Sequence, residues 1–201
     1  MESPSGRVAS LAVLGIVAGP LTLAALGLTH PSDLTSGTAP YWRDLHIILL
    51  PLFPLLGVNL WWLLGSARDP VSWLGRVAAF VFIAFYSGLD VLAGIAAGAV
   101  VAAGVSNVAE ATSPLFAQAS RLGGIGASSF VIGAALTGVL LVARTGRAAV
   151  PGAVLLVVGA VLFRDNHIYF PLGVAAMLAL AAGFGLLQWR RLTRAQVTAP
   201  P

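Results

Sequence analysis

Six long apolar segments, separated by short polar ones, make up most of this chain. They cover residues 8–28, 45–64, 77–103, 122–143, 148–163 and 168–188. A helix that crosses the hydrocarbon core of a bilayer needs about 20 consecutive apolar residues, and all six segments except 148–163 reach that length. The pattern predicts an all-α fold, a polytopic membrane protein whose single domain over residues 1–201 is a bundle of six transmembrane helices.

The composition agrees with a membrane setting. Hydrophobic residues make up 58% of the chain and charged residues only 9%, whereas an average soluble domain has about 25% charged residues. A soluble fold of this size could not remove that much apolar surface from water. We therefore expect the lipid bilayer as the surroundings of the chain and a multi-pass position in the cell membrane.

The arginines indicate how the bundle is oriented. With both termini in the cytoplasm, only Arg43, Arg121 and Arg164 lie outside. The other eight arginines then lie on the cytoplasmic side: Arg7, Arg68, Arg76, Arg144, Arg147, Arg190, Arg191 and Arg194. Cytoplasmic loops carry the excess of basic residues in membrane proteins. This bias predicts an N-in, C-in topology.

Residue types that are missing narrow the chemistry. The chain has no cysteine, which excludes thiol catalysis and iron–sulfur clusters. It also has no lysine, which excludes a Schiff base. The net charge of +4 comes from arginines at the ends of apolar segments rather than from a clustered basic face, so no nucleic-acid partner is expected.

Asp90 is the most informative single residue, because it lies in the middle of the apolar segment 77–103. An ionised carboxylate at that depth is costly unless it faces the bundle interior. We expect it to point inward, either as a structural hydrogen-bond partner of Asn59, Ser128 or Thr137, or in a pathway for a small solute or ion that Asn59 and Ser128 also line. Both alternatives stay open.

A short pattern occurs twice, and both copies contain a histidine. The copies are Arg43-Asp44-Leu45-His46-Ile47 and Arg164-Asp165-Asn166-His167-Ile168. They could be remnants of a duplicated helical hairpin, as in many transport proteins. They could also be helix starts, at which Asp is a favoured N-cap. In either case we expect His46 and His167 on the same side of the membrane and at similar depth.

These two copies form a candidate outer polar site made of Arg43, Asp44, His46, Arg164, Asp165 and His167. Imidazole and carboxylate groups together can bind zinc or another divalent metal, which makes His46 and His167 candidate metal ligands. The same two histidines could instead ligate a haem iron from both sides. Plain ion pairs, such as Arg43 with Asp44, are the simpler interpretation.

The polar connections are less informative. The outer segment from His30 to Pro40 could cap an outward-facing cavity or be an ordinary loop. The residues from Gly104 to Ser120, with Glu110, are expected to be a solvated connection. The glycines of segments 77–103 and 122–143 favour close packing of these two helices.

Three functions remain. The first is a small-solute or ion carrier or channel with Asp90 in its pathway and an outward-facing polar site. The second is a membrane-embedded metal- or haem-dependent enzyme that uses His46 and His167. The third is a non-catalytic accessory or sensing subunit. Apart from the bilayer, a small solute or ion and a second copy of the chain are the partners considered.

Overall fold

The structure is a computed structural model that describes residues 4–198, with side chains described for residues 9–194. Six of its helices are long and apolar enough to cross a membrane, so the predicted all-helical fold and the count of six are confirmed. The elements are α1 Pro4–Gly27, α2 Ala39–Leu64, α3 Pro70–Leu89, the π-helix η1 Asp90–Ala96, α4 Ala97–Ala102, α5 Val108–Thr145, the short 3-10 helix η2 Arg147–Ala149, α6 Val150–Asn166 and α7 Leu172–Thr198.

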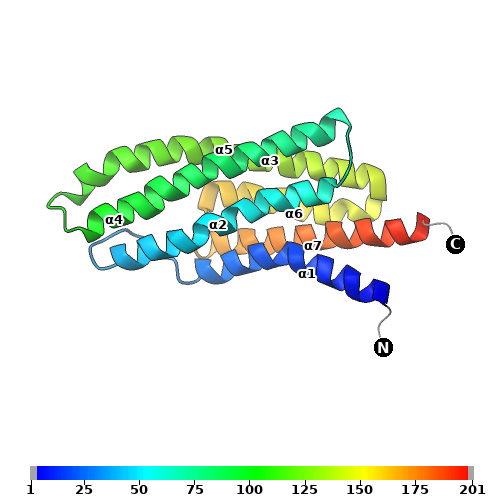
Figure 1. The fold of residues 1–201 in the computed structure, drawn as a ribbon, viewed down its shortest axis with the longest axis horizontal. Coiled ribbons are helices and arrows are strands. Elements are labelled where there is room, and N and C mark those ends of the chain that lie inside the picture. The colour runs from blue at the N-terminus through cyan, green and yellow to red at the C-terminus, as the bar shows by residue number, and fades with distance from the viewer. Residues whose placement is uncertain (1–3, 199–201) are drawn as a thin grey trace.

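The long helices run along one axis and form an elongated bundle (Figure 1). α3, η1 and α4 follow one another as a single span, from Pro70 to Ala102. This span packs against α5 on one side and α2 on the other, while α6 lies against α5 and α7, and α1 lies against α7. Both described ends of the chain lie at the same end of the bundle (Figure 1).

The predicted packing of the third and fourth spans is confirmed by contacts between their backbones. A Cβ atom built on Gly126 of α5 would lie 2.8 Å from the backbone nitrogen of Tyr86 in α3. The Leu89 side chain also packs directly on Gly123: a Cβ atom built on Gly123 would lie 2.0 Å from Leu89 Cδ1. Small residues let helices approach this closely where there is no water to exclude between them.

Several helices begin earlier than the apolar pattern predicts. Helix α2 begins at Ala39 rather than at residue 45, and α3 begins at Pro70, after the N-cap Asp69. The largest correction concerns residues 104–120, which are not a long connection, because α5 already begins at Val108. Asn107 caps it: the Asn107 Oδ1 accepts a hydrogen bond from the Glu110 backbone N–H, and the Asn107 Nδ2 donates to the Glu110 carboxylate.

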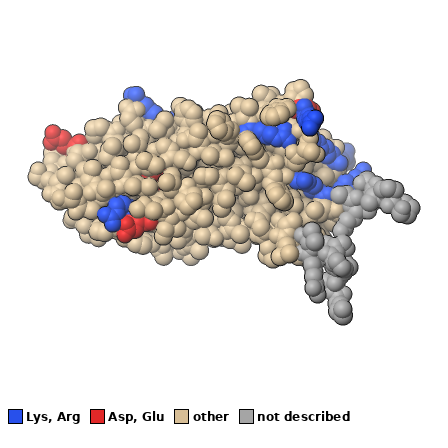
Figure 2. Space-filling view, viewed as in Figure 1, with Lys and Arg blue, Asp and Glu red and all other residues tan. Residues whose placement is uncertain are grey.

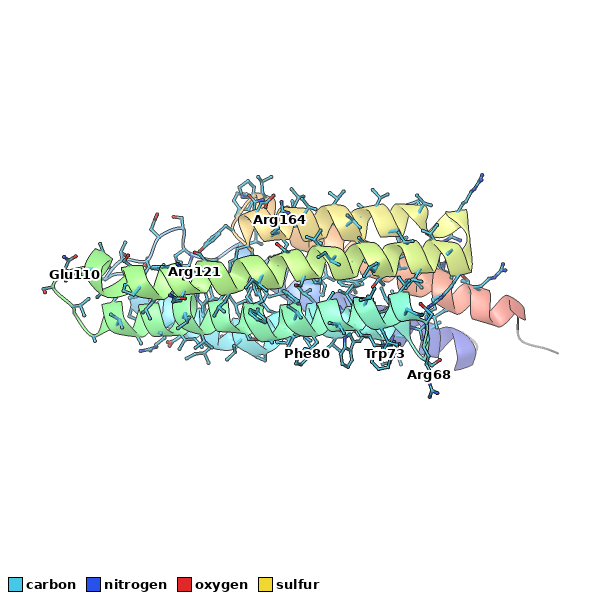
Figure 3. The ribbon with its side chains drawn as sticks, turned by 90° about the horizontal axis from the view of Figure 1, so that it is seen from above. Arg68, Trp73, Phe80, Glu110, Arg121 and Arg164 are labelled. Atoms are coloured by element: carbon cyan, nitrogen blue, oxygen red, sulfur yellow. The ribbon has the colours of Figure 1, made fainter. Side chains whose placement is uncertain are left out.

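The capped start makes α5 a helix of 38 residues, about 57 Å long at 1.5 Å per residue. A hydrocarbon core is only about 30 Å thick. The hairpin of α4 and α5 therefore projects past the other helices, with Glu110 at its tip (Figures 1 and 3).

The two Arg-Asp-x-His copies have different local structures. Arg43 and Asp44 lie in the second turn of α2, whose N-cap is Thr38. Arg164 and Asp165 lie in the last turn of α6, and His167 caps the end of that helix. The prediction that both copies begin a helix is therefore wrong. A duplicated hairpin would place the copies at equivalent positions, and they are not.

On the face shown in Figure 2, charged side chains gather toward the two ends of the bundle and are sparse between them. We call the end with both termini the arginine end. Its described arginines are Arg68, Arg76, Arg144, Arg147, Arg190, Arg191 and Arg194. We call the opposite end, where α2 begins and α6 ends, the histidine end. It carries His30, His46 and His167.

Candidate metal centre

Three histidines from three separate segments meet at the histidine end. His30 lies in the turn after α1, His46 lies in α2 and His167 follows α6. Each offers one ring nitrogen, and these nitrogens all lie within 4.8 Å of one another. The rings of His46 and His167 have centroids 6.4 Å apart, so the prediction that these two lie at one end and at similar depth is confirmed.

His46 lies on the buried face of α2 and is only 2% exposed. Its ring packs directly on Gly94 of η1, where a Cβ atom would lie 2.1 Å from the imidazole Cδ2. The neighbouring Ala93 carbonyl accepts a hydrogen bond of 3.0 Å from the Trp42 indole nitrogen. Single π-helical segments inside α-helices occur frequently at functional sites, and this one positions the wall behind His46.

His167 has a left-handed backbone conformation, with φ of 52°, and its backbone N–H donates to the Phe163 carbonyl. A positive φ is uncommon for a residue other than glycine and often marks a functional constraint. Ile168, the next residue, lies against the end of α1. A Cβ atom built on Gly27 would be 2.4 Å from the Ile168 carbonyl oxygen. The end of α1 therefore fixes the position of the segment that carries His167.

Each of the three rings is anchored through its Nδ1 atom. His30 donates to the Pro31 carbonyl at 2.7 Å, and His46 donates to the Trp42 carbonyl at 2.7 Å. A carbonyl can only accept, so the Nε2 atom of each neutral ring carries the lone pair. Nδ1 of His167 shares a hydrogen bond of 2.6 Å with the Tyr86 hydroxyl. Metal-bound histidines are held in this way by partners on their second nitrogen.

The Nε2 atom of His30 is available to a metal ion. His30 Nε2 is buried and has no hydrogen-bond partner among the residues that the structure describes. Burial lowers the pKa of His30, with the Pro31 hydrogen bond opposing this effect. Burial also lowers the pKa of His167 well below its ordinary value, and His30 and His46 add to that decrease. Rings in these positions are neutral near pH 7.

The three nitrogens lie farther apart than they would around one bound ion, so the rings would have to move closer together to hold it. A zinc ion holds imidazole nitrogens at about 2.0–2.1 Å, which places the nitrogens of a tetrahedral site roughly 3.4 Å apart. The observed separations of up to 4.8 Å are somewhat larger. Imidazole ligands suit zinc, copper, nickel and iron.

The haem hypothesis fits less well. A macrocycle ligated by His46 and His167 would need open space around the midpoint between their rings. The His30 ring lies beside that midpoint, with its centroid 5.1 Å from the His46 ring and 5.6 Å from the His167 ring. The arrangement favours a bare ion with three histidine ligands.

The carboxylates of the predicted outer polar site take no part in this cluster. Arg43 pairs with Asp44 at 2.7 Å and Arg164 with Asp165 at 2.8 Å, so the ion-pair interpretation of these residues is confirmed. The Asp44 and Asp165 side chains are 58% and 53% exposed. In both copies the histidine therefore faces inward and the Arg–Asp pair faces outward.

A cavity of about 390 Å³ adjoins the histidines. His46, Tyr86, His167 and Tyr169 line its inner wall, and small residues of α5, among them Gly124, line the opposite wall. Burial, helped by Asp33, raises the pKa of Tyr169 to about 12, so its hydroxyl stays protonated. The cavity gives a small molecule room to approach two of the three histidines.

His30 is the ligand candidate that the sequence interpretation missed. The sequence predicts the segment from His30 to Pro40 only as a cap on an outward-facing cavity or as an ordinary loop. The sequence does contain a feature that points to His30. The chain has only three histidines, and the six-helix topology places all three at polar edges on the same side. The turn after α1 folds back over the bundle, and His30 becomes 9% exposed.

Asp90 is fully buried, as expected, but the hydrogen bonds predicted for it are absent. Neither carboxylate oxygen has a hydrogen-bond partner in residues 9–194, and the Thr137 hydroxyl is equally without one. Asn59 donates instead to the Ile16 carbonyl at 2.7 Å, because it faces α1. Ser128 is exposed on the surface of α5. Asp90, Asn59 and Ser128 thus lie in three different environments.

Comparison with known proteins adds no family to this description. No protein-family model, no curated protein and no solved structure matches the chain. A proposed function therefore depends on the residues of the site alone.

Proposed function

We propose that the chain is a membrane metalloenzyme in which His30, His46 and His167 hold one divalent transition metal, with zinc the first candidate. The observation that carries the proposal is the convergence of three ring nitrogens within 4.8 Å while every Nδ1 is engaged elsewhere. A cation would satisfy the buried His30 Nε2, which has no hydrogen-bond partner in the described residues, and would account for three imidazoles gathered at one place.

The adjoining cavity favours catalysis over a purely structural ion. Structural zinc sites are closed by four protein ligands, whereas catalytic ones have three and keep a position for water or substrate. Zinc bound in this way lowers the pKa of its water to about 7 and polarises a carbonyl group. The Tyr86 hydroxyl orients His167, and Tyr169 brings a second protonated hydroxyl to the cavity wall. Hydrolysis of a small ester or amide fits such a site.

A carrier or channel for a small solute or ion is the second candidate. Asp90 supports it, because a fully buried carboxyl without hydrogen-bond partners in the described chain is the group expected in an ion or proton pathway. Metal retention separates the two functions. An enzyme keeps its ion through purification, whereas a carrier exchanges it.

The proposal includes an orientation in the cell membrane. With the arginine end in the cytoplasm, both termini are cytoplasmic and the histidine end faces outward. A reporter fused after Pro201 should be active only in the cytoplasm. Activity of that fusion outside the cell would reverse the orientation without affecting the metal site.

Metal analysis of the purified protein tests the site itself. We expect one zinc or related ion per chain, and His30→Gln, His46→Gln or His167→Gln should each weaken its binding by more than about a hundredfold, since even outer partners contribute 10–100-fold. Asp44→Asn is the matched control, because that carboxylate belongs to the Arg–Asp pair, and it should bind normally. Each variant is first checked for a single elution peak and native helical content. A wild-type protein that retains no more metal than the histidine variants would refute the proposal.

A further inference from the structure

The seam between α5 and α6 carries two hollows rather than one. The first is the cavity of about 390 Å³ beside the histidines, whose mouth includes Ser120 and Arg164. The second is a groove of about 570 Å³ farther along the same two helices. Its walls are apolar, with Val139 and Val142 from α5 and Val154 and Val158 from α6 among them.

The two hollows are close enough for one molecule to occupy both. Ala127 lines the cavity and Ala135 lines the groove, and these two residues of α5 are about 12 Å apart along the helix axis. The acyl chains of one leaflet extend over about 15 Å, half the thickness of the hydrocarbon core. A molecule of that length would lie along the seam with one end at the histidines.

The chemical character changes along the seam in the same direction. The cavity has an ion pair at its mouth, Arg164 with Asp165 at 2.8 Å, and imidazoles at its inner end. The groove offers exposed valines, Val139 at 68% and Val154 at 54%. Figure 3 shows Arg164 at the end of α6, beside α5. A polar group matches the first hollow and an alkyl chain the second.

The mouth of the cavity is kept open by a small residue. Gly124 of α5 lines the cavity and is exposed, and a Cβ atom built on it would meet nothing within 4 Å. Helix packing therefore does not require a glycine at this position. A larger residue there would fill the entrance while leaving the contacts of α5 in place.

We propose that the substrate of the histidine site is an amphipathic lipid whose polar group enters the cavity and whose alkyl chain lies in the groove between α5 and α6. This inference rests on the proposed metal site and names the class of molecule on which it acts. The lipid would enter from the membrane, since α5 and α6 line the groove and also contribute residues to the cavity beside the histidines.

Cobalt and two hydroxamates test this in the full-length protein in detergent micelles. The visible absorption of bound Co²⁺ reports first on metal binding and then on hydroxamate binding to the metal. Acetohydroxamic acid has no tail, and dodecanohydroxamic acid has one. Gly124→Leu should weaken both by at least about tenfold, because the added side chain would occupy the cavity that both probes enter. Val154→Trp should weaken only the long probe, by at least about fivefold.

Matched controls come from the same chain. Gly15 of α1 also has nothing within 4 Å of a built Cβ atom, and Gly15→Leu should bind both probes normally. Val77 of α3 is 54% exposed, and Val77→Trp should leave the long probe unaffected. If cobalt and the short probe bind but Val154→Trp acts no differently from Val77→Trp, the lipid inference is overturned and the metal site stands. If cobalt does not bind, both are overturned.

Discussion

The arginine end and the histidine end both gather polar side chains from several helices, but they differ in how those groups are satisfied. At the arginine end, Arg144 donates to Asp69 and to the Ser72 hydroxyl. Arg191 donates to the Trp62 carbonyl, and Arg76 donates to the Gly65 carbonyl. At the histidine end, His30 Nε2 is buried without a partner in the part of the chain that the structure describes.

This difference separates a structural role from a functional one. The paired arginines stabilise the fold locally at helix ends, although the buried Gln188 Oε1 of α7 near the same end also lacks a partner among residues 9–194. A buried polar group without a partner costs about 1–3 kcal/mol, so it is retained where binding of another molecule satisfies it. Substitutions at the two ends and at the buried Asp90 test this contrast.

Gly27→Ala should have the largest effect. The added Cβ would lie 2.4 Å from the Ile168 carbonyl oxygen, and backbone atoms cannot move aside cheaply. We expect a loss of stability of about 3 kcal/mol together with weaker metal binding, because the segment that carries His167 is displaced. Thermal unfolding and metal analysis measure the two effects. Gly37→Ala is the control, since its Cβ would meet only the Thr35 hydroxyl, at 3.8 Å. Equal stability of the two variants would contradict the close approach.

Tyr86→Phe should weaken metal binding by roughly 10–100-fold while the protein stays folded, because it removes the hydrogen-bond partner of a proposed metal ligand. The lost group is the hydroxyl 2.6 Å from His167 Nδ1. Competition with a chelator of known affinity gives the measurement. Tyr41→Phe removes a hydroxyl that bonds only to exposed Thr29 and should leave metal affinity unchanged. An unaltered affinity in the Tyr86 variant would remove this tyrosine from the site.

Asp90→Leu tests whether the buried carboxyl serves structure or function. Both its oxygens lack a partner in the described residues, so a leucine, which has the same branched shape without polar atoms, should raise stability by about 1–2 kcal/mol. Asp90→Asn should change stability less, because it keeps a polar group. A carrier that needs this acid would lose transport in both variants while remaining folded. Unfolding of the leucine variant would instead indicate a structural partner.

Arg144→Gln should give the smallest effect, because its ion pair with Asp69 is partly exposed and such pairs contribute little. The Ser72 backbone and hydroxyl bonds lower the pKa of Asp69, and Arg144 lowers it further. A carboxylate with a lowered pKa adds stability above its usual pKa near 4 and loses it as the pH falls further. Thermal unfolding between pH 6 and pH 3 should therefore show a smaller acid loss in the variant than in Arg147→Gln. Equal acid losses would contradict this pairing.

The apolar pattern alone determined the six helices, because each helix that crosses a bilayer must satisfy its own backbone and present apolar side chains to lipid. It did not determine where the helices end. Apolarity reports the residues that lie in hydrocarbon, whereas α5 continues through the polar residues before 122 because Asn107 and Glu110 cap it. The repeated pattern likewise placed His46 and His167 together but did not distinguish inward from outward side chains.

Only the tertiary structure decided the candidate metal centre. The turn after α1 folds over α2 and brings His30 to the other two rings, and the left-handed backbone of His167 turns its ring toward them. Gly94 and Gly27 permit the close approaches that hold this arrangement. His30 and His46 are 16 residues apart in the sequence, and His167 follows 121 residues after His46. Their convergence depends on how helices pack against one another, and local patterns along a chain do not encode that packing.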